Sequence, residues 1–141
     1  MNDQKKVALF FDDFQFPVSY GDLKDFITDE LNRLSKETGY RMDHLKLEFK
    51  ENFKDDVVAY FQRAGDQPIG FCFFLNKFQN TSPNKIADTC RHEFSHFVVC
   101  MKNAGHQPAD AHGTQWKKVC GTLGAKPSPV MNHLPTRHIV K

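Results

Sequence analysis

The spacing of apolar residues changes along the chain from a helical period to strict alternation, and this change decides the fold class. After Ser19, five apolar residues recur at the three- and four-residue spacing of a helix with one apolar face: Leu23, Phe26, Ile27, Leu31 and Leu34. Ser19 and Asp22 resemble a capping box and Gly39 offers a stop, so we expect a helix over 20–37. From residue 44 to residue 50 apolar and charged residues alternate, which predicts a strand with one buried face.

Two more strands are expected at 56–62 and 69–75, because both segments are rich in β-branched and aromatic residues. The Gly-Asp-Gln-Pro stretch at 65–68 is typical of a turn between them. Three strands with short connections predict a three-stranded antiparallel sheet. The third strand is almost wholly apolar, so we expect it at the centre of the sheet or beneath a helix.

Two helices follow the predicted sheet. Ser82 and Pro83 have the residue types of an N-cap and a first helical position, and the helix is expected to run to about Asn103. A last helix is expected from about Thr114 to Gly121 or Gly124. The sequence therefore predicts an α+β fold in one domain over residues 1–126, followed by an extended C-terminal tail at 127–141.

The first twenty residues are aromatic and leave two alternatives open. Phe10, Phe11, Phe14 and Phe16 precede Pro17, which fits either a short strand or an aromatic lid packed on the body of the protein.

We expect an ordinary cytoplasmic protein, and a monomer. The 141 residues suit one domain, and a net charge of +2 is too small to predict nucleic-acid or membrane binding by itself. The four cysteines form no CxxC pair, so we expect reduced, structural thiols. Neither a signal peptide nor a membrane-spanning run is recognisable.

The segment His-Glu-Phe-Ser-His at 92–96 matches the pattern H-E-x-x-H. On a helix, positions four apart differ by only ~40° in direction, so His92 and His96 project from one face and can share a tetrahedral Zn²⁺. Glu93 lies ~100° round from His92, beside such an ion, where it can act as general base toward the water that zinc activates. This spacing predicts the catalytic helix of a zincin-type hydrolase.

The rest of this predicted helix agrees with the motif. Its apolar residues cluster on the side opposite the two histidines: Ile86, Cys90, Phe94, Phe97, Val98 and Met101. We therefore expect one face to pack on the sheet and the histidine face to open into a cleft.

A catalytic zinc needs a third protein ligand and an open fourth position. The candidates downstream are His106, Asp110 and His112, with His133 and His138 in the tail. We favour His112, because the helix that follows it would hold the imidazole rigidly and Gly113 allows close approach of the backbone.

The two segments 92–96 and 112–117, His-Gly-Thr-Gln-Trp-Lys, together resemble the SprT-like metallopeptidases, the relatives of Spartan. The resemblance implies a zincin-like core of a helix, a three-stranded sheet, the HExxH helix and a final helix. It also implies His92, His96 and His112 as zinc ligands and Glu93 as the catalytic base. Its extent is about residues 20–125, but its specific content lies in these two segments.

The chain departs from this family in two respects. No cysteine follows Cys120, so we do not expect the C-terminal zinc ribbon that many members carry. The basic residues after position 116 are few and scattered, so DNA is a weakly supported partner. Arg91 could orient a substrate, although an ion pair with Asp88 at helical spacing is the simpler expectation.

We therefore expect a zinc metallopeptidase that cleaves a protein or peptide substrate through Glu93. The alternative is a non-catalytic zinc-containing module that docks protein or nucleic acid. An intact Glu93 argues against the alternative, because a structural zinc needs no base.

Overall fold

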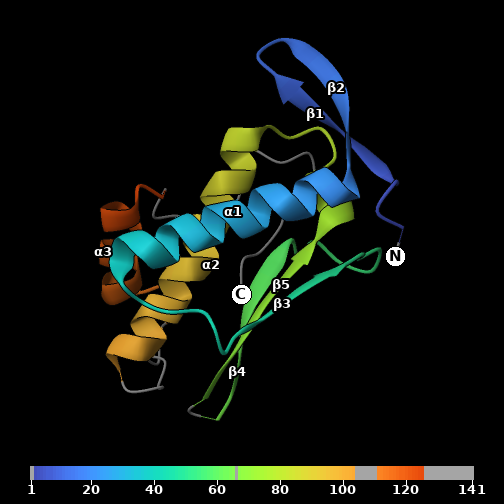
Figure 1. Ribbon diagram of the computed structural model, residues 1–141. Coiled ribbons are helices and arrows are strands. Elements are labelled where there is room, and N and C mark those ends of the chain that lie inside the picture. The colour runs from blue at the N-terminus through green and yellow to red at the C-terminus, as the bar shows by residue number, and fades with distance from the viewer. Residues whose placement is uncertain (1, 66, 104–110, 126–141) are drawn as a thin grey trace.

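The computed structural model describes residues 2–65, 67–103 and 111–125, and its elements are mixed helices and strands (Figure 1). In chain order these are β1 (Lys6–Phe11), β2 (Phe14–Ser19), α1 (Tyr20–Thr38), β3 (Lys46–Lys50), β4 (Ala59–Ala64), β5 (Gln67–Phe74), a 3-10 turn (Leu75–Phe78), α2 (Pro83–Lys102) and α3 (Thr114–Leu123). The predicted α+β class is confirmed. The predicted tail at 127–141 lies outside the described residues.

The ends of the helices follow the capping residues of the sequence. The Ser19 hydroxyl accepts a hydrogen bond from the Asp22 amide at 3.1 Å, and Gly39 ends α1 with φ 77°, a left-handed conformation that glycine adopts without strain. Ser82 caps α2 in the same way, with Pro83 as its first residue. The predictions for all three helices are confirmed within one or two residues.

The three-stranded sheet has the order β3-β5-β4, so β5 is central as predicted. The expectation of an all-antiparallel sheet is wrong, because β3 runs parallel to β5 and only β4 runs antiparallel to it. The connection 51–58 explains the difference. Asn52 holds it in a fixed path, donating from Nδ2 to the Val57 carbonyl at 3.0 Å and accepting from the Lys54 amide at 3.0 Å. Strand β4 therefore begins two strand positions away from β3, and β5 later fills the position between them.

Gly70 allows β3 and β5 to approach closely. A Cβ atom at this position would lie 2.0 Å from the carbonyl oxygen of Lys46, the residue opposite it on β3. A side chain there would force the two strands apart.

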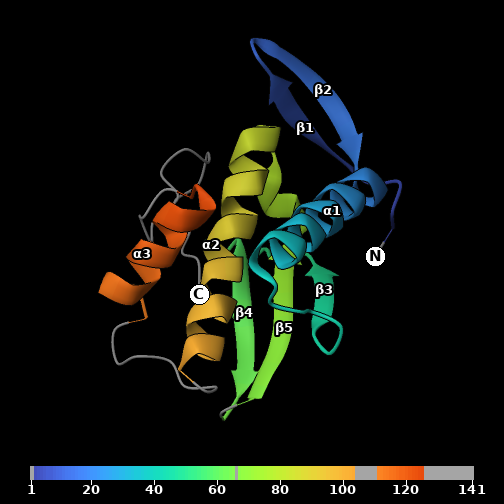
Figure 2. The same cartoon turned by 60° about the vertical axis from the view of Figure 1, so that its left-hand side comes forward.

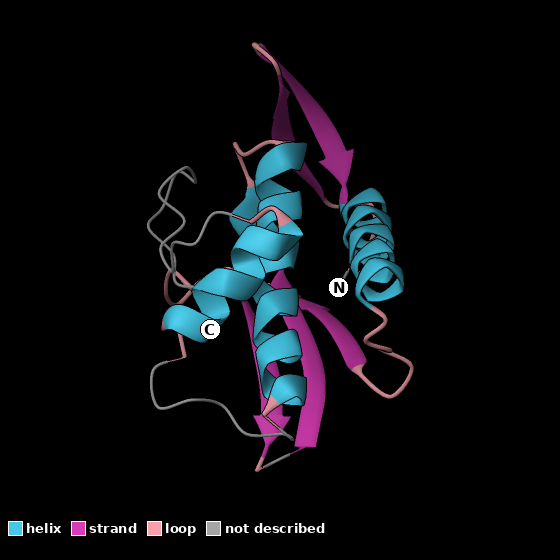
Figure 3. Cartoon of the chain, turned by 90° about the vertical axis from the view of Figure 1, so that its left-hand side faces the viewer, coloured by secondary structure: helices cyan, strands magenta, loops and turns pink. Residues whose placement is uncertain are grey.

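Helices α1 and α2 lie over the sheet, and α3 packs against α2 (Figures 2 and 3). Between α2 and the sheet, aromatic rings make the centre of the core: Phe71 of β5 contacts Phe94 and Phe97 of α2 at centroid distances of 6.4 and 6.1 Å. All four cysteines are buried and none is in a disulfide, as expected. None of the helices in the described part of the chain combines the length and the hydropathy that a membrane span needs.

The aromatic N-terminal segment is a β-hairpin and not a lid. β1 and β2 pair antiparallel across the turn at Asp12 and Asp13, and the hairpin projects away from the rest of the molecule (Figure 1). Its base is tied to the segment before α2, where the Phe10 amide donates to the Thr81 carbonyl and the Asn80 amide to the Ala8 carbonyl, both at 2.7 Å.

Candidate metal centre

The HExxH residues lie in the middle of α2, on a stretch that is buried on every side. His92 and Glu93 are fully buried and His96 is 2% exposed. The predicted apolar face is present, except that Met101 is 39% exposed near the end of the helix. The expectation that the histidine face opens into a cleft is wrong for the residues described, because α3 packs against it.

The turn before α3 places the predicted third ligand, His112, beside His96. The Nε2 atoms of His96 and His112 lie 3.1 Å apart, although sixteen positions separate the residues in sequence. Two ligand atoms on a tetrahedral zinc ion, each about 2.05 Å from the metal, are roughly 3.3 Å apart. The two imidazoles therefore have nearly the spacing that one shared ion requires. His106, Asp110, His133 and His138, the other candidates, lie outside the described residues.

Trp116 packs against all three histidines. Its ring centroid lies 5.3 Å from that of His92, 5.4 Å from that of His96 and 4.7 Å from that of His112. The indole Nε1–H also donates to the His92 carbonyl at 3.4 Å. Trp116 of α3 thus packs on the histidine face of α2 and fixes how these two helices lie against each other. Trp116 belongs to the segment 112–117 that carries the family resemblance, but its contacts with the histidines could not be predicted from the sequence.

The Nε2 atom of His92 faces a carboxylate, whereas those of His96 and His112 face each other. Its Nε2 lies 3.4 Å from Oδ2 of Asp88, one turn earlier on α2, and Asp88 is itself nearly buried. The predicted partner of Asp88, Arg91, has its Nε 3.4 Å from Glu30 of α1 instead. The position of Asp88 four residues before His92 is the only signal in the sequence that could have indicated this contact.

The donor set suits zinc, but the full ligand set is not assembled. As the side chains stand, no three His, Cys, Asp or Glu residues among those described are grouped so as to hold a metal ion. His96 and His112 already have the required spacing, whereas the Nε2 of His92 lies beside Asp88. Imidazole nitrogens are preferred zinc ligands. The site therefore fits zinc if the His92 ring turns toward the other two.

Glu93 is buried without a hydrogen bond from the described residues to either carboxylate oxygen. Burial raises the pKa of Glu93 well above its ordinary value, and the nearby backbone of Phe61 on β4 only partly opposes this shift. A buried carboxyl group with so little hydrogen bonding is costly, so it marks a place where a cation or a polar ligand would stabilise the protein.

The imidazole of His96 is held in its neutral form. Burial, together with the neighbouring rings of His112 and His92, lowers its pKa to about 3. At neutral pH this ring therefore keeps the lone pair that a metal ion needs.

Comparisons with models of known protein families, with curated proteins and with solved structures find no match for this chain. The resemblance to SprT-like peptidases accordingly stays a prediction, which depends on the segments 92–96 and 112–117.

Proposed function

We propose that this protein is a zinc-dependent metallopeptidase of the SprT-like, zincin kind. The observation that carries the proposal is the 3.1 Å approach of His112 to His96, beside a buried Glu93. A third histidine that reaches the HExxH helix from the turn before the next helix is what a three-ligand zinc site requires.

In this proposal His92, His96 and His112 hold the metal through their imidazole nitrogens. Zinc, when bound, would activate water at neutral pH and polarise the scissile carbonyl. Glu93 accepts the proton of the attacking water and returns it to the leaving amine. The carboxylate must be ionised for this role, and a cation beside Glu93 offsets the effect of burial on its pKa.

β4 supplies a place for an extended peptide substrate. It is the edge strand of the sheet β3-β5-β4, and its residue Phe61 lies near Glu93. The unpaired backbone groups of an edge strand can bind an added strand. A peptide held in this way would run past Glu93, which supports a protein or peptide as the substrate.

One observation favours the alternative, a non-catalytic zinc-containing module that docks protein or nucleic acid. His92 and Glu93 are fully buried. A zinc ion enclosed in this way would be structural. Four protein ligands on the bound zinc would support this alternative.

The test is cleavage of casein or histones by the wild type and by Glu93→Gln, with metal content measured on the same samples. Glu48→Gln, which changes a half-buried glutamate of β3, is the matched control. We expect one zinc per chain in all three proteins and loss of cleavage in Glu93→Gln alone. Zinc binding without cleavage of any substrate would favour the docking module, and full cleavage by Glu93→Gln would refute the role of Glu93. Repeating the assay with single-stranded DNA tests whether DNA stimulates the activity.

A further inference from the structure

The tip of the β1–β2 hairpin carries an unusual number of exposed aromatic side chains. Four of the seven exposed large hydrophobic residues among those described are here, and we call them the aromatic tip: Phe10 (38% exposed), Phe11 (43%), Phe14 (69%) and Phe16 (51%). The strand register places Phe11, Phe14 and Phe16 on the same face as Val7 and Leu9, which are buried in the core at the hairpin base. A continuous apolar face therefore begins in the core and ends in solvent. Such a patch marks an interaction surface.

The edge of the hairpin is less suited to binding than its aromatic tip. The amide and carbonyl of Ala8 both point to the segment 79–80, away from β2. Pro17, the partner of Ala8, therefore faces the free edge of β2 with a nitrogen that has no hydrogen. This blocks the addition of a further strand, and the aromatic side chains remain as the binding element.

Charge narrows the choice of partner for the aromatic tip. Asp12 and Asp13 form its turn, and no lysine or arginine lies between residues 7 and 23. Neither carboxylate makes an ion pair with the rest of the described chain. Phosphates of nucleic acids and anionic lipids would be repelled by this turn. A suitable partner has an apolar hollow bordered by positive charge.

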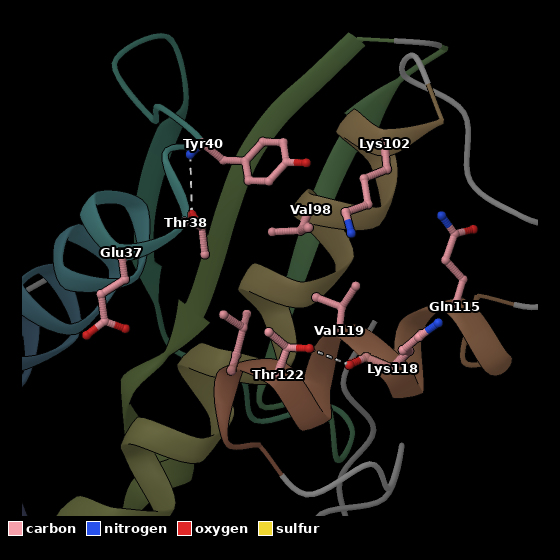
Figure 4. Close-up of a pocket in the computed structure, with 10 residues that line it drawn as sticks. Glu37, Thr38, Tyr40, Val98, Lys102, Gln115, Lys118, Val119 and Thr122 are labelled. Atoms are coloured by element: carbon pink, nitrogen blue, oxygen red, sulfur yellow. Dashed lines mark hydrogen bonds between the residues drawn. The ribbon is translucent and has the colours of Figure 1, made fainter.

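The chain itself contains such a hollow, a cavity of about 520 Å³ between the C-terminal ends of α1 and α2 and one side of α3 (Figure 4). We call it the helix cavity. Its apolar wall is formed by Tyr40, Val98, Val119 and Leu123, and Lys102 and Lys118 border it. Neither lysine is within ion-pair distance of a described carboxylate, while the acidic lining residue, Glu37, is paired with Arg33 at 2.6 Å. The predicted metal ligands do not line it.

We propose that the aromatic tip of one copy of this chain binds the helix cavity of another copy, so that the protein associates head to tail. Phe11 and Phe14 fill the apolar part of the cavity, and Asp12 and Asp13 meet Lys102 and Lys118. The hydrogen bonds that tie the hairpin base to residues 79–81 hold the tip in its binding shape, which lowers the entropic cost of association. This inference goes beyond the proposed function and does not depend on it.

The contact must be between two molecules. The hairpin enters α1 at its first residue, and the helix cavity lies at the last turn of α1, nineteen residues or about 28 Å away. The hairpin also points away from the body at that first end (Figures 1 and 2), so it cannot reach the cavity of its own chain. Because the two surfaces differ, the contact is heterologous and leaves one tip and one cavity unused in every dimer, so larger species form unless a ring closes.

Analytical ultracentrifugation over a range of concentrations tests the proposal. We expect the wild type to form dimers and larger species as concentration rises. Phe14→Asp, a tip variant, and the double variant Lys102→Glu with Lys118→Glu, a cavity variant, should each weaken association about 30-fold or more, as expected for central interface residues. Both changes are at the surface, and circular dichroism checks that the variants are folded.

The matched controls carry the same chemical changes away from both surfaces. Phe53→Asp alters an exposed phenylalanine of the 51–58 connection, and Lys46→Glu with Lys54→Glu alters two exposed lysines. Both controls should associate like the wild type.

Mixing the tip variant with the cavity variant gives the decisive result. The first retains an intact cavity and the second an intact tip, so the mixture should form a heterodimer that grows no further. A wild type that stays monomeric at all concentrations up to about 1 mM would overturn the proposal. Association of the cavity variant with itself would also overturn it, because the tips would then bind one another.

Discussion

The burial of His96 makes the stability of the metal-free protein depend on pH by an amount that can be calculated. In the unfolded chain the imidazole has its ordinary pKa of 6.5, whereas burial lowers it to about 3 in the folded protein. Below pH 6.5 the unfolded chain binds a proton that the folded protein excludes, so stability is complete above pH 6.5 and is lost as pH falls toward 3. Between pH 7 and pH 5 the loss from this one group is about 2 kcal/mol of unfolding free energy.

The assay is urea denaturation in the presence of a chelator at pH 7 and at pH 5. Other groups also titrate in this range, so the loss in the wild type is compared with that in His96→Gln, which should be smaller by about 2 kcal/mol. His44→Gln, which changes an exposed histidine, is the control and should lose as much stability as the wild type. An equal loss in His96→Gln and the wild type would refute the view that a buried neutral imidazole is present at this position.

Three further substitutions test the packing that positions the site. Gly70→Ala should lower the unfolding free energy by about 3 kcal/mol or more in thermal denaturation, because the new Cβ would lie 2.0 Å from the Lys46 carbonyl oxygen. Gly121→Ala is the control and should not destabilise the protein, because its new Cβ would have no atom within 4 Å. Ser82→Ala removes the N-cap of α2 and should cost about 1 kcal/mol in the same assay. Trp116→Leu should weaken zinc binding about 10- to 100-fold in competition with a chelating dye, because the indole that orients the three imidazoles is lost; unchanged zinc affinity would contradict that role.

The helices could be predicted closely because their signals are local. A hydroxyl at Ser19 or Ser82 and a glycine at Gly39 act on backbone groups within four residues, and a sequence pattern records such contacts directly. The strand positions were also predictable from alternation and β-branched residues. The direction of β3 was not, because it depends on the path of the connection 51–58, which Asn52 fixes by contacts with the Asn76 side chain, 24 positions further along the chain.

The candidate metal site, like the fold, has features that could be predicted from the sequence and features that could not. The HExxH motif and the His-Gly block indicated which histidines approach one another, and the 3.1 Å contact of His96 with His112 agrees with that prediction. The enclosure of the site was not predictable, because it results from α3 packing over the histidine face of α2. The hairpin has no Asn-Gly or Asp-Gly turn signal, so pairing across Asp12 and Asp13 was hidden among the aromatic residues.

Equilibrium zinc binding by the wild type and by His112→Gln tests the central claim most directly, which is that His92, His96 and His112 form one metal site. We predict one zinc ion per wild-type chain and an affinity lower by at least about 100-fold in His112→Gln, since the loss of a ligand costs no less than the loss of its supporting residues. A variant that binds zinc as tightly as the wild type, or a wild type that binds none, would contradict the claim.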